Sequence, residues 1–289
     1  QMFLALVVLA NLFVIFTKAA ASAGRIEAIL KTEPAITGGT AELSKDKDAV
    51  LEMDKISFGY SEGESAIEQI SFTIQPHQTV GLIGGTGCGK STIVQLLPRL
   101  IDPTAGEIRL GGVPLREFLL ADLRRRIRIV PQKAVLFSGT IRENLRWGNQ
   151  DADDAALWQA LTLAQGRDFV EAMPQGLDTL LVQGGKNCSG GQRQRLCIAR
   201  ALVGRPSLLV LDDSTSALDY QTDARLRQSL KKIEGSPAVL IVSQRIASIR
   251  HADFILVMDQ GRLVGQGTHE ELLDSCAVYQ EIVRSQTRE

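Results

Sequence analysis

The chain has 289 residues, of which 44% are hydrophobic and 22% are charged, and it contains 26 glycines and 9 prolines. These fractions are typical of a globular protein with one large domain or two small ones, and they exclude collagen-like, coiled-coil and disordered classes. The 32 basic and 33 acidic residues leave a formal net charge of −1, so we expect no nucleic-acid partner held by bulk charge. The four cysteines, Cys88, Cys188, Cys197 and Cys276, form no C-x-x-C pair, which argues against a disulfide framework or a zinc site.

An apolar segment opens the chain and extends from Met2 to Phe16 with Asn11 as its one polar residue. A helix of about 15 residues is roughly 22 Å long, which is shorter than the roughly 30 Å hydrocarbon core of a bilayer. A signal peptide is an alternative, because Ala21-Ser22-Ala23 resembles a cleavage site, and a buried helix is another. Because the chain starts at Gln1 without a basic segment, we interpret residues 1–24 as the end of a transmembrane helix with a cytoplasmic extension.

Basic residues follow the apolar segment, and none precedes it: Lys18, Arg25 and Lys31. The positive-inside bias therefore predicts that the rest of the chain lies on the cytoplasmic side of the cell membrane, with the helix in contact with membrane lipid. The chain would be part of a longer, multi-pass membrane protein. Residues 25–48 include the charged run Lys45-Asp46-Lys47-Asp48 and predict a linker, which leaves residues 49–289 as the main domain.

From residue 50 onward, apolar segments of strand length alternate with helical patterns. The predicted strands are 50–58, 67–74, 79–83, 208–211, 239–242, 254–257 and 262–264. The last two flank Asp259-Gln260-Gly261, which is a hairpin signal. A helix is expected over 91–100 with its end near Pro98, and a capping box of Thr268 and Glu271 opens a final helix. This alternation predicts an α/β fold with antiparallel strands at its start.

The strongest motif is the segment Gly84-Gly85-Thr86-Gly87-Cys88-Gly89-Lys90-Ser91, which Thr92 follows. It fits G-x-x-x-x-G-K-[ST] and lies between a predicted strand and a predicted helix, as a phosphate-binding loop requires. The glycines let backbone N–H groups turn toward phosphate oxygens, and the helix presents its positive end to the same anion. Lys90 would contact the β- and γ-phosphates and Ser91 would bind Mg²⁺, so the motif predicts a nucleotide site.

An acidic element accompanies this loop. Asp212 ends the apolar strand 208–211, where a metal-holding aspartate beside a phosphate loop is expected, and Asp213 follows it directly. An acid after a buried strand, taken alone, is more often a helix cap or a loop residue. The phosphate loop upstream makes Mg²⁺ binding the favoured interpretation of Asp212.

The segment Cys188-Ser189-Gly190-Gly191-Gln192 lies between these two elements. Ser189 and the glycines can open a helix that runs to Leu202 and presents its N-terminus to a phosphate. With these three motifs, the chain resembles the ATP-binding cassette family from about Val50 to its C-terminus. The family signature reads L-S-G-G-Q, so Cys188 replaces the leucine. The resemblance implies ATP as the nucleotide and a P-loop core with an antiparallel β subdomain and an α-helical signature subdomain at about 133–200.

The resemblance also implies roles for single residues. Tyr60 corresponds to the aromatic residue that stacks on adenine, and Gln132 to the glutamine that contacts Mg²⁺ and the attacking water and touches the membrane domain. Ser216-Ala217-Leu218-Asp219 corresponds to the loop that crosses to the partner cassette. In the family, two cassettes pack head to tail, so Ser189, Gly190, Gly191, Gln192 and Asp219 would contact ATP bound to a second half-transporter subunit.

Two catalytic positions depart from the family pattern. The residue after the metal aspartate is usually a glutamate that polarises water, and here it is Asp213, whose carboxylate is retracted by roughly 1.5 Å, one C–C bond. A misplacement of about 1 Å can cost roughly 100-fold in rate. The switch histidine of the family corresponds to Gln244, which can donate a hydrogen bond but carries no imidazole charge.

These features predict a subunit of an ATP-binding cassette exporter that binds Mg-ATP at a hydrolysis-impaired site. Its signature would complete an active site on a different partner, as in a heterodimeric exporter. A slow homodimeric exporter and a regulatory or channel-like cassette that uses ATP as a clamp remain alternatives. The helices that bind the transported substrate would precede Gln1, so the substrate stays unassigned.

Overall fold

A computed structural model describes residues 1–41, 50–61, 63–214, 218–231 and 237–287. The chain divides into two compact units, Gln1–Thr37 and Gly38–Glu289. The first is mostly the helix α1 (Met2–Leu30), which has 29 residues, no buried side chain and a mean hydropathy of 2.2 in its most apolar window. Its length and composition suit a bilayer crossing, and it continues well beyond the apolar segment at its start. The charged run 45–48 of the predicted linker lies outside the described residues.

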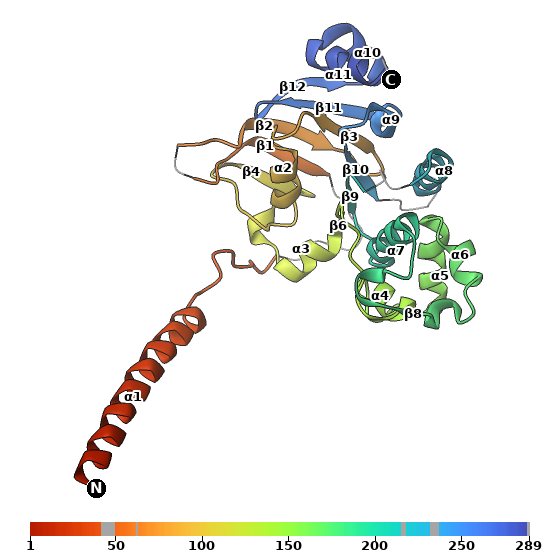
Figure 1. Cartoon of the computed structure of the whole chain (residues 1–289). Coiled ribbons are helices and arrows are strands. Elements are labelled where there is room, and N and C mark those ends of the chain that lie inside the picture. The colour runs from red at the N-terminus through yellow and green to blue at the C-terminus, as the bar shows by residue number, and fades with distance from the viewer. Residues whose placement is uncertain (42–49, 62, 215–217, 232–236, 288–289) are drawn as a thin grey trace. The chain divides into compact units, whose positions relative to one another are not determined.

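The second unit is built on a six-stranded sheet (Figure 1). In spatial order its strands are β12 (Arg262–Gly267), β11 (Phe254–Asp259), β3 (Thr79–Gly84), β10 (Ala238–Val242), β9 (Leu208–Asp212) and β6 (Ile127–Val130). All pairs among β11, β3, β10, β9 and β6 are parallel. The pair of β11 and β12 is antiparallel, which confirms the predicted hairpin.

The central strands β3, β9 and β10 of this sheet are buried on both faces, and neighbouring residues of a strand belong to different hydrophobic cores. In β9, Leu208 and Val210 belong to one core, while Leu209 and Leu211 belong to the other. Strand residues point alternately to the two faces, so a strand covered on both faces must be apolar at every position. The continuous apolar runs in the sequence are explained by this double burial.

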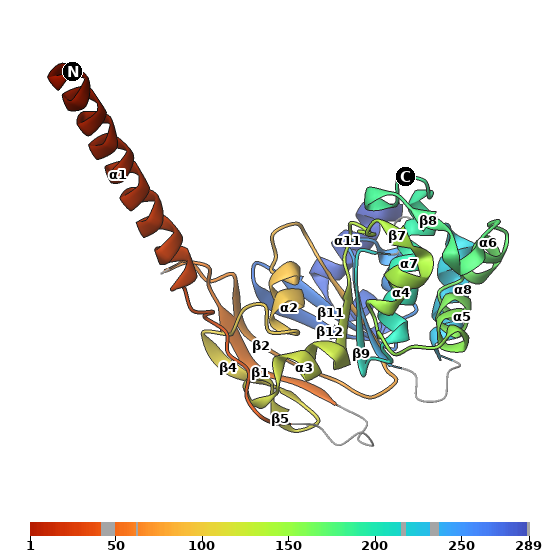
Figure 2. The same ribbon diagram turned by 90° about the horizontal axis from the view of Figure 1, so that it is seen from below.

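A four-stranded antiparallel sheet and two short helices cover one face. The sheet consists of β2 (Ile67–Ile74), β1 (Leu51–Phe58), β4 (Ala105–Leu110) and β5 (Val113–Pro114), and the helices are α2 (Lys90–Leu96) and α3 (Leu120–Arg126). Their apolar side chains share one core with β3, β9, β10 and β11. Figure 2 shows this layer on the far side of the six-stranded sheet from the helices α4–α7. The predicted α/β fold with antiparallel strands at its start is confirmed.

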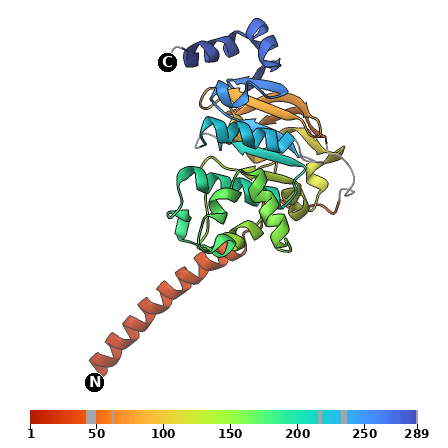
Figure 3. The same cartoon turned by 90° about the vertical axis from the view of Figure 1, so that its right-hand side faces the viewer.

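The remaining helices contribute to the second core. They are α4 (Ile141–Arg146), α5 (Asp154–Leu163), α6 (Arg167–Glu171), α7 (Gly190–Val203), α8 (Tyr220–Lys231), α9 (Ile246–Ile249), α10 (His269–Ser275) and α11 (Ala277–Thr287), with the short strands β7 (Gly139–Thr140) and β8 (Leu180–Leu181) among them. The helices α4–α7 lie near the β6 edge of the sheet and α10–α11 near the β12 edge (Figures 1 and 3). The helical segment between β6 and β9 carries the signature motif at the start of α7.

The sequence prediction agrees with the end of one helix and differs at another. The helix α2 ends at Leu96, near Pro98 as expected, because Pro98 has no N–H to continue the hydrogen-bond ladder. The capping box of Thr268 and Glu271 is present, but it opens α10, which is not the final helix. Cys276 adopts an extended conformation that ends α10 and separates it from α11.

Candidate functional site

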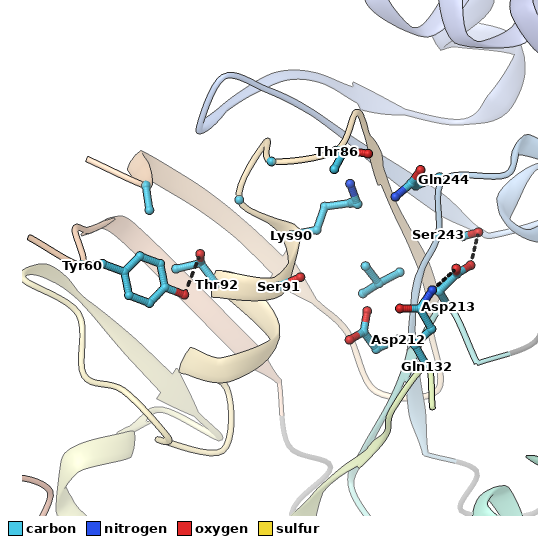
Figure 4. A pocket seen from close by; sticks show the side chains of 14 residues that line it. Tyr60, Thr86, Lys90, Ser91, Thr92, Gln132, Asp212, Asp213, Ser243 and Gln244 are labelled. Carbon is cyan, nitrogen blue, oxygen red and sulfur yellow. Dashed lines mark hydrogen bonds between the residues drawn. The ribbon is translucent and has the colours of Figure 1, made fainter. Parts of the chain in front are cut away.

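A cavity of about 370 Å³ lies where the parallel strands β3, β9 and β10 end (Figure 4). It is lined by Tyr60, Ala66, Thr86, Gly87, Gly89, Lys90, Ser91, Thr92, Gln132, Asp212, Asp213, Val242, Ser243 and Gln244. Most of the residues that the sequence assigned to nucleotide and metal binding therefore meet in one place. Gly84, Gly85 and Cys88 belong to the same loop but lie outside this lining.

The glycine-rich loop is held in shape by close contacts of its backbone. Gly89 has a φ of 101°, in the left-handed region that a side chain disfavours. A Cβ at Gly84 would lie 2.3 Å from the Met258 carbonyl oxygen on β11. These two positions therefore require glycine, and the loop can turn sharply between β3 and α2.

The Lys90 side chain is buried under this loop. Its Nζ donates to the carbonyl oxygens of Gly84 and Gly85, each at 2.7 Å, and lies 3.5 Å from Cys88 Sγ. An ammonium group has three donors, and sulfur is a weak acceptor. The carbonyls thus fix the position of the charge, and the third donor can turn to a phosphate oxygen.

An exposed aromatic side chain marks one end of the cavity. The Tyr60 ring is 62% exposed and packs edge-on against Phe58, with 4.9 Å between ring centroids. Its hydroxyl lies 3.3 Å from Thr92 Oγ1 on α2. These contacts orient the ring while its free face remains able to stack on a planar base.

A hydrogen-bonded carboxylate marks the other end. Asp213 Oδ2 accepts from Gln132 Nε2 at 3.1 Å, and Asp213 Oδ1 lies 3.3 Å from the hydroxyl of Ser243. The backbone of Asp213 has a φ of 46° and its N–H donates to the Val242 carbonyl at 2.7 Å. The Asp213 carboxylate is therefore tied to the loops after β6 and β10.

Asp212 lies between these two ends, and its carboxyl has a raised pKa. Burial raises its pKa first, the neighbouring Asp213 carboxylate raises it further, and the Lys90 ammonium partly offsets both effects. Mg²⁺ prefers one or two carboxylates together with hydroxyl and phosphate oxygens. The donor set of Asp212, the Ser91 hydroxyl and the Gln132 amide fits a magnesium ion that shares its coordination with a nucleotide.

The Gln244 side chain extends into the cavity on the side of Lys90 and Thr86 (Figure 4). It stands opposite Tyr60, so a bound nucleotide with its base on Tyr60 and its phosphates on the glycine-rich loop would point its last phosphate toward Gln244. An amide can donate to a phosphate oxygen there, but it carries no charge.

The signature residues lie elsewhere, at the N-terminus of α7. The Ser189 hydroxyl accepts from the Gln192 N–H at 3.2 Å, and Gln192 Oε1 accepts from the Ser189 N–H at 2.9 Å. This capping box leaves Ser189 and Gly190 exposed. Asp219 caps α8 through Thr222, whose hydrogen bonds lower the pKa of the Asp219 carboxyl. Ser216 and Ala217 lie outside the described residues.

Sequence reasoning overlooked Ser243. It follows β10 directly, its hydroxyl bonds to Asp213, and the same oxygen accepts from the Arg245 N–H at 3.0 Å. A hydroxyl residue at the end of a buried strand was the available signal, because such an end faces the cavity in a parallel sheet.

The chain is similar to known ABC transporter proteins. The family model described as ABC transporter matches residues 67–216. The chain is 42% identical over 95% of its length to the ABC transporter ATP-binding protein YfiB of Bacillus subtilis, covering 48% of that protein. It is 40% identical over 89% of its length to the ATP-dependent lipid A-core flippase of Alcanivorax borkumensis, covering 44% of it. The chain spans about half the length of the curated relatives it matches.

A solved structure shares the fold. The structure of a bacterial Atm1-family ABC exporter with ATP bound superimposes with a TM-score of 0.88 at 32% sequence identity. The match covers 94% of this chain and 48% of that protein.

The raised pKa of Asp212 yields a stability prediction. Between its unfolded and folded pKa values the folded chain binds more protons, so stability falls as the pH rises through this window. At pH 7 and without Mg²⁺, Asp212→Asn should therefore raise the melting temperature by about 2–4 °C, the shift that on the order of 1 kcal/mol produces in a domain of this size. The difference should shrink as the pH falls and Asp212 takes up a proton.

Thermal unfolding of the chain in detergent, followed by circular dichroism, checks this expectation, with the exposed Asp274→Asn on α10 as the matched control. Added Mg-ATP should then stabilise the unsubstituted chain more than Asp212→Asn. A lower melting temperature for Asp212→Asn at pH 7 would contradict the electrostatic account.

Proposed function

Because this chain belongs to the ABC transporter family, we propose that it is the ATP-binding part of an ABC exporter and couples ATP binding and hydrolysis to transport across the cell membrane. The observation that carries this proposal is the single cavity that joins Tyr60, the glycine-rich loop with Lys90, and Asp212. These residues supply a stacking surface, a fixed positive charge and a metal-holding carboxylate in the order in which ATP presents its base, phosphates and Mg²⁺.

The binding chemistry follows from the contacts of each residue. Lys90 holds its charge beside the loop carbonyls and donates to the terminal phosphates. Asp212, Ser91 and Gln132 hold Mg²⁺, which when bound neutralises the developing charge on the phosphate oxygens. Tyr60 orients the base through stacking.

We further propose that hydrolysis at this site is slow. A water-polarising carboxylate must reach the water beside the terminal phosphate, whereas both oxygens of Asp213 face hydrogen-bond donors of the protein. Asp213 is also one C–C bond shorter than glutamate. Gln244 cannot supply the positive charge of a histidine to the terminal phosphate.

The exposed signature supports a role across an interface. Ser189 and Gly190 open α7 outside the cavity, so this helix N-terminus would serve a nucleotide bound elsewhere. We propose that the signature residues and Asp219 contact ATP held by a second half-transporter subunit. In this arrangement α1 crosses the membrane of a multi-pass protein, and the second unit lies in the cytoplasm.

Lys90→Ala tests the nucleotide site. Hydrogen bonds to charged groups contribute about 1.5–3 kcal/mol, so the variant should bind Mg-ATP roughly 10- to 100-fold more weakly. Titration with a fluorescent ATP analogue measures the affinity, and Lys55→Ala, at an exposed lysine of β1, serves as the control. Equal affinities of Lys90→Ala and the unsubstituted chain would refute the assignment of the site.

Asp213→Asn tests the impaired hydrolysis. In the assembled exporter it should change steady-state phosphate release less than twofold, because the partner site carries the turnover. The double variant Asp213→Glu with Gln244→His should raise turnover at this site by more than the two single variants combined, since groups that act on one transition state are not additive. A tenfold fall for Asp213→Asn would mean that Asp213 is a working base, as a slow homodimeric exporter would require.

Ser189→Ala tests the role across the interface. Loss of a donor aimed at developing charge costs on the order of 100-fold, so the ATPase activity of the assembled exporter should fall at least tenfold. Binding of ATP at the Lys90 site should persist. Thr268→Ala is the matched control, because it removes a capping box of the same type, worth about 1 kcal/mol, from α10. Full turnover with Ser189→Ala, or an equal loss with Thr268→Ala, would rule out the role in trans.

A further inference from the structure

One side chain of the C-terminal helix reaches the segment that follows β10. The Gln286 amide of α11 donates from Nε2 to the Gln244 carbonyl oxygen at 2.7 Å and accepts through Oε1 from the Ile246 N–H at 2.9 Å. A primary amide carries donors and an acceptor side by side. It can therefore bind a C=O and an N–H that lie two residues apart in one chain.

The segment that Gln286 binds is short and relies on side chains for part of its backbone hydrogen bonding. It lies between β10 and α9, and α9 has four residues, too few to be stable alone. The Ile246 N–H belongs to the first turn of α9, where backbone donors have no partner within the helix. Gln286 satisfies this donor, and the Ser243 hydroxyl accepts from the N–H of Arg245 between them. Side chains thus satisfy the N–H groups of Arg245 and Ile246, while the Ser243 N–H still donates to the Leu82 carbonyl of β3.

We propose that Gln286 is a positioning residue of the nucleotide site, which sets the place of the Gln244 side chain against the terminal phosphate. The Gln244 carbonyl that Gln286 binds and the side chain that lines the cavity belong to the same residue. Holding this carbonyl limits the rotation of the Gln244 backbone and therefore the reach of its amide. The inference rests on the proposed function, because it requires a nucleotide with a terminal phosphate in the cavity.

The fold does not depend on this contact. Gln286 is exposed, whereas α11 is anchored by the fully buried Tyr279, whose hydroxyl lies 2.7 Å from His269 Nδ1. Ile282 and Val283 pack against the same core as β10 and β11. Removing the Gln286 amide should therefore release the Gln244 carbonyl and the Ile246 N–H while α11 stays in place.

The test compares ATP with ADP, because only ATP has the phosphate that Gln244 would reach. The unsubstituted chain, Gln286→Met, Gln286→Ala and Gln280→Met are titrated in detergent with Mg²⁺ and either ADP or a non-hydrolysable ATP analogue. Gln280 is the matched control, since it is a glutamine of the same helix whose Nε2 donates to the Leu273 carbonyl at 2.7 Å. Gln286→Met and Gln286→Ala should lower the preference for the ATP analogue over ADP about three- to tenfold, and Gln280→Met should leave it unchanged.

Amide hydrogen exchange supplies a second readout that does not require a nucleotide. The Ile246 N–H should exchange at least threefold faster in Gln286→Met than in the unsubstituted chain or in Gln280→Met. An unchanged nucleotide preference in Gln286→Met, an equal loss for ADP and the ATP analogue, or unchanged exchange at Ile246 would overturn the proposal. Failure of the unsubstituted chain to bind either nucleotide would instead overturn the proposed function.

Discussion

The site depends on the register of the parallel strands. Val242 of β10 pairs with Leu82 of β3 on one side and with Asp212 of β9 on the other, and Leu211 of β9 pairs with Val130 of β6. All four strands therefore end at one edge, and the residues that follow them lie next to one another. Motifs that are separated by more than 150 residues in the chain, from the glycine-rich loop to Gln244, meet there.

The covered faces of the sheet keep this edge rigid. Side chains of β3, β9 and β10 are buried in one core or the other, so the strand ends cannot shift without opening both cores. The rigid strand ends also hold the loop residues that follow them. Asp213 adopts a left-handed backbone that is unfavourable for a residue with a side chain, and its N–H bond to Val242 holds it there. The strand thus places the Asp213 carboxylate beside Gln132 and Ser243.

The sequence predicted the parts of the site whose signals are local. The glycine-rich loop, the strand before Asp212 and the helix start at Ser189 each combine a motif with its own secondary structure, and the structure contains all three elements. The contacts from Ser243 to Asp213 and from Gln286 to Gln244 join residues 30 and 42 positions apart. They depend on the packing of α11 and on the ends of two strands, which no local pattern encodes. Pro98 indicated the end of α2, whereas the break at Cys276 was overlooked because no proline or glycine marks it.

The charged residues at the strand ends, two aspartates and a lysine, are of the kind that bind a metal ion together with phosphate groups. Asp212 and Asp213 place two carboxylates next to each other, and burial makes the charged form of Asp212 unfavourable. The Lys90 ammonium partly offsets this effect, but two of its three donors already bind the loop carbonyls. A divalent cation at this edge would relieve the repulsion between the acids, and phosphate oxygens could share its coordination and accept from Lys90. The unfavourable charged form of Asp212 is therefore a local cost in the free chain, and a ligand that neutralised this charge and bound only the folded state would stabilise the fold.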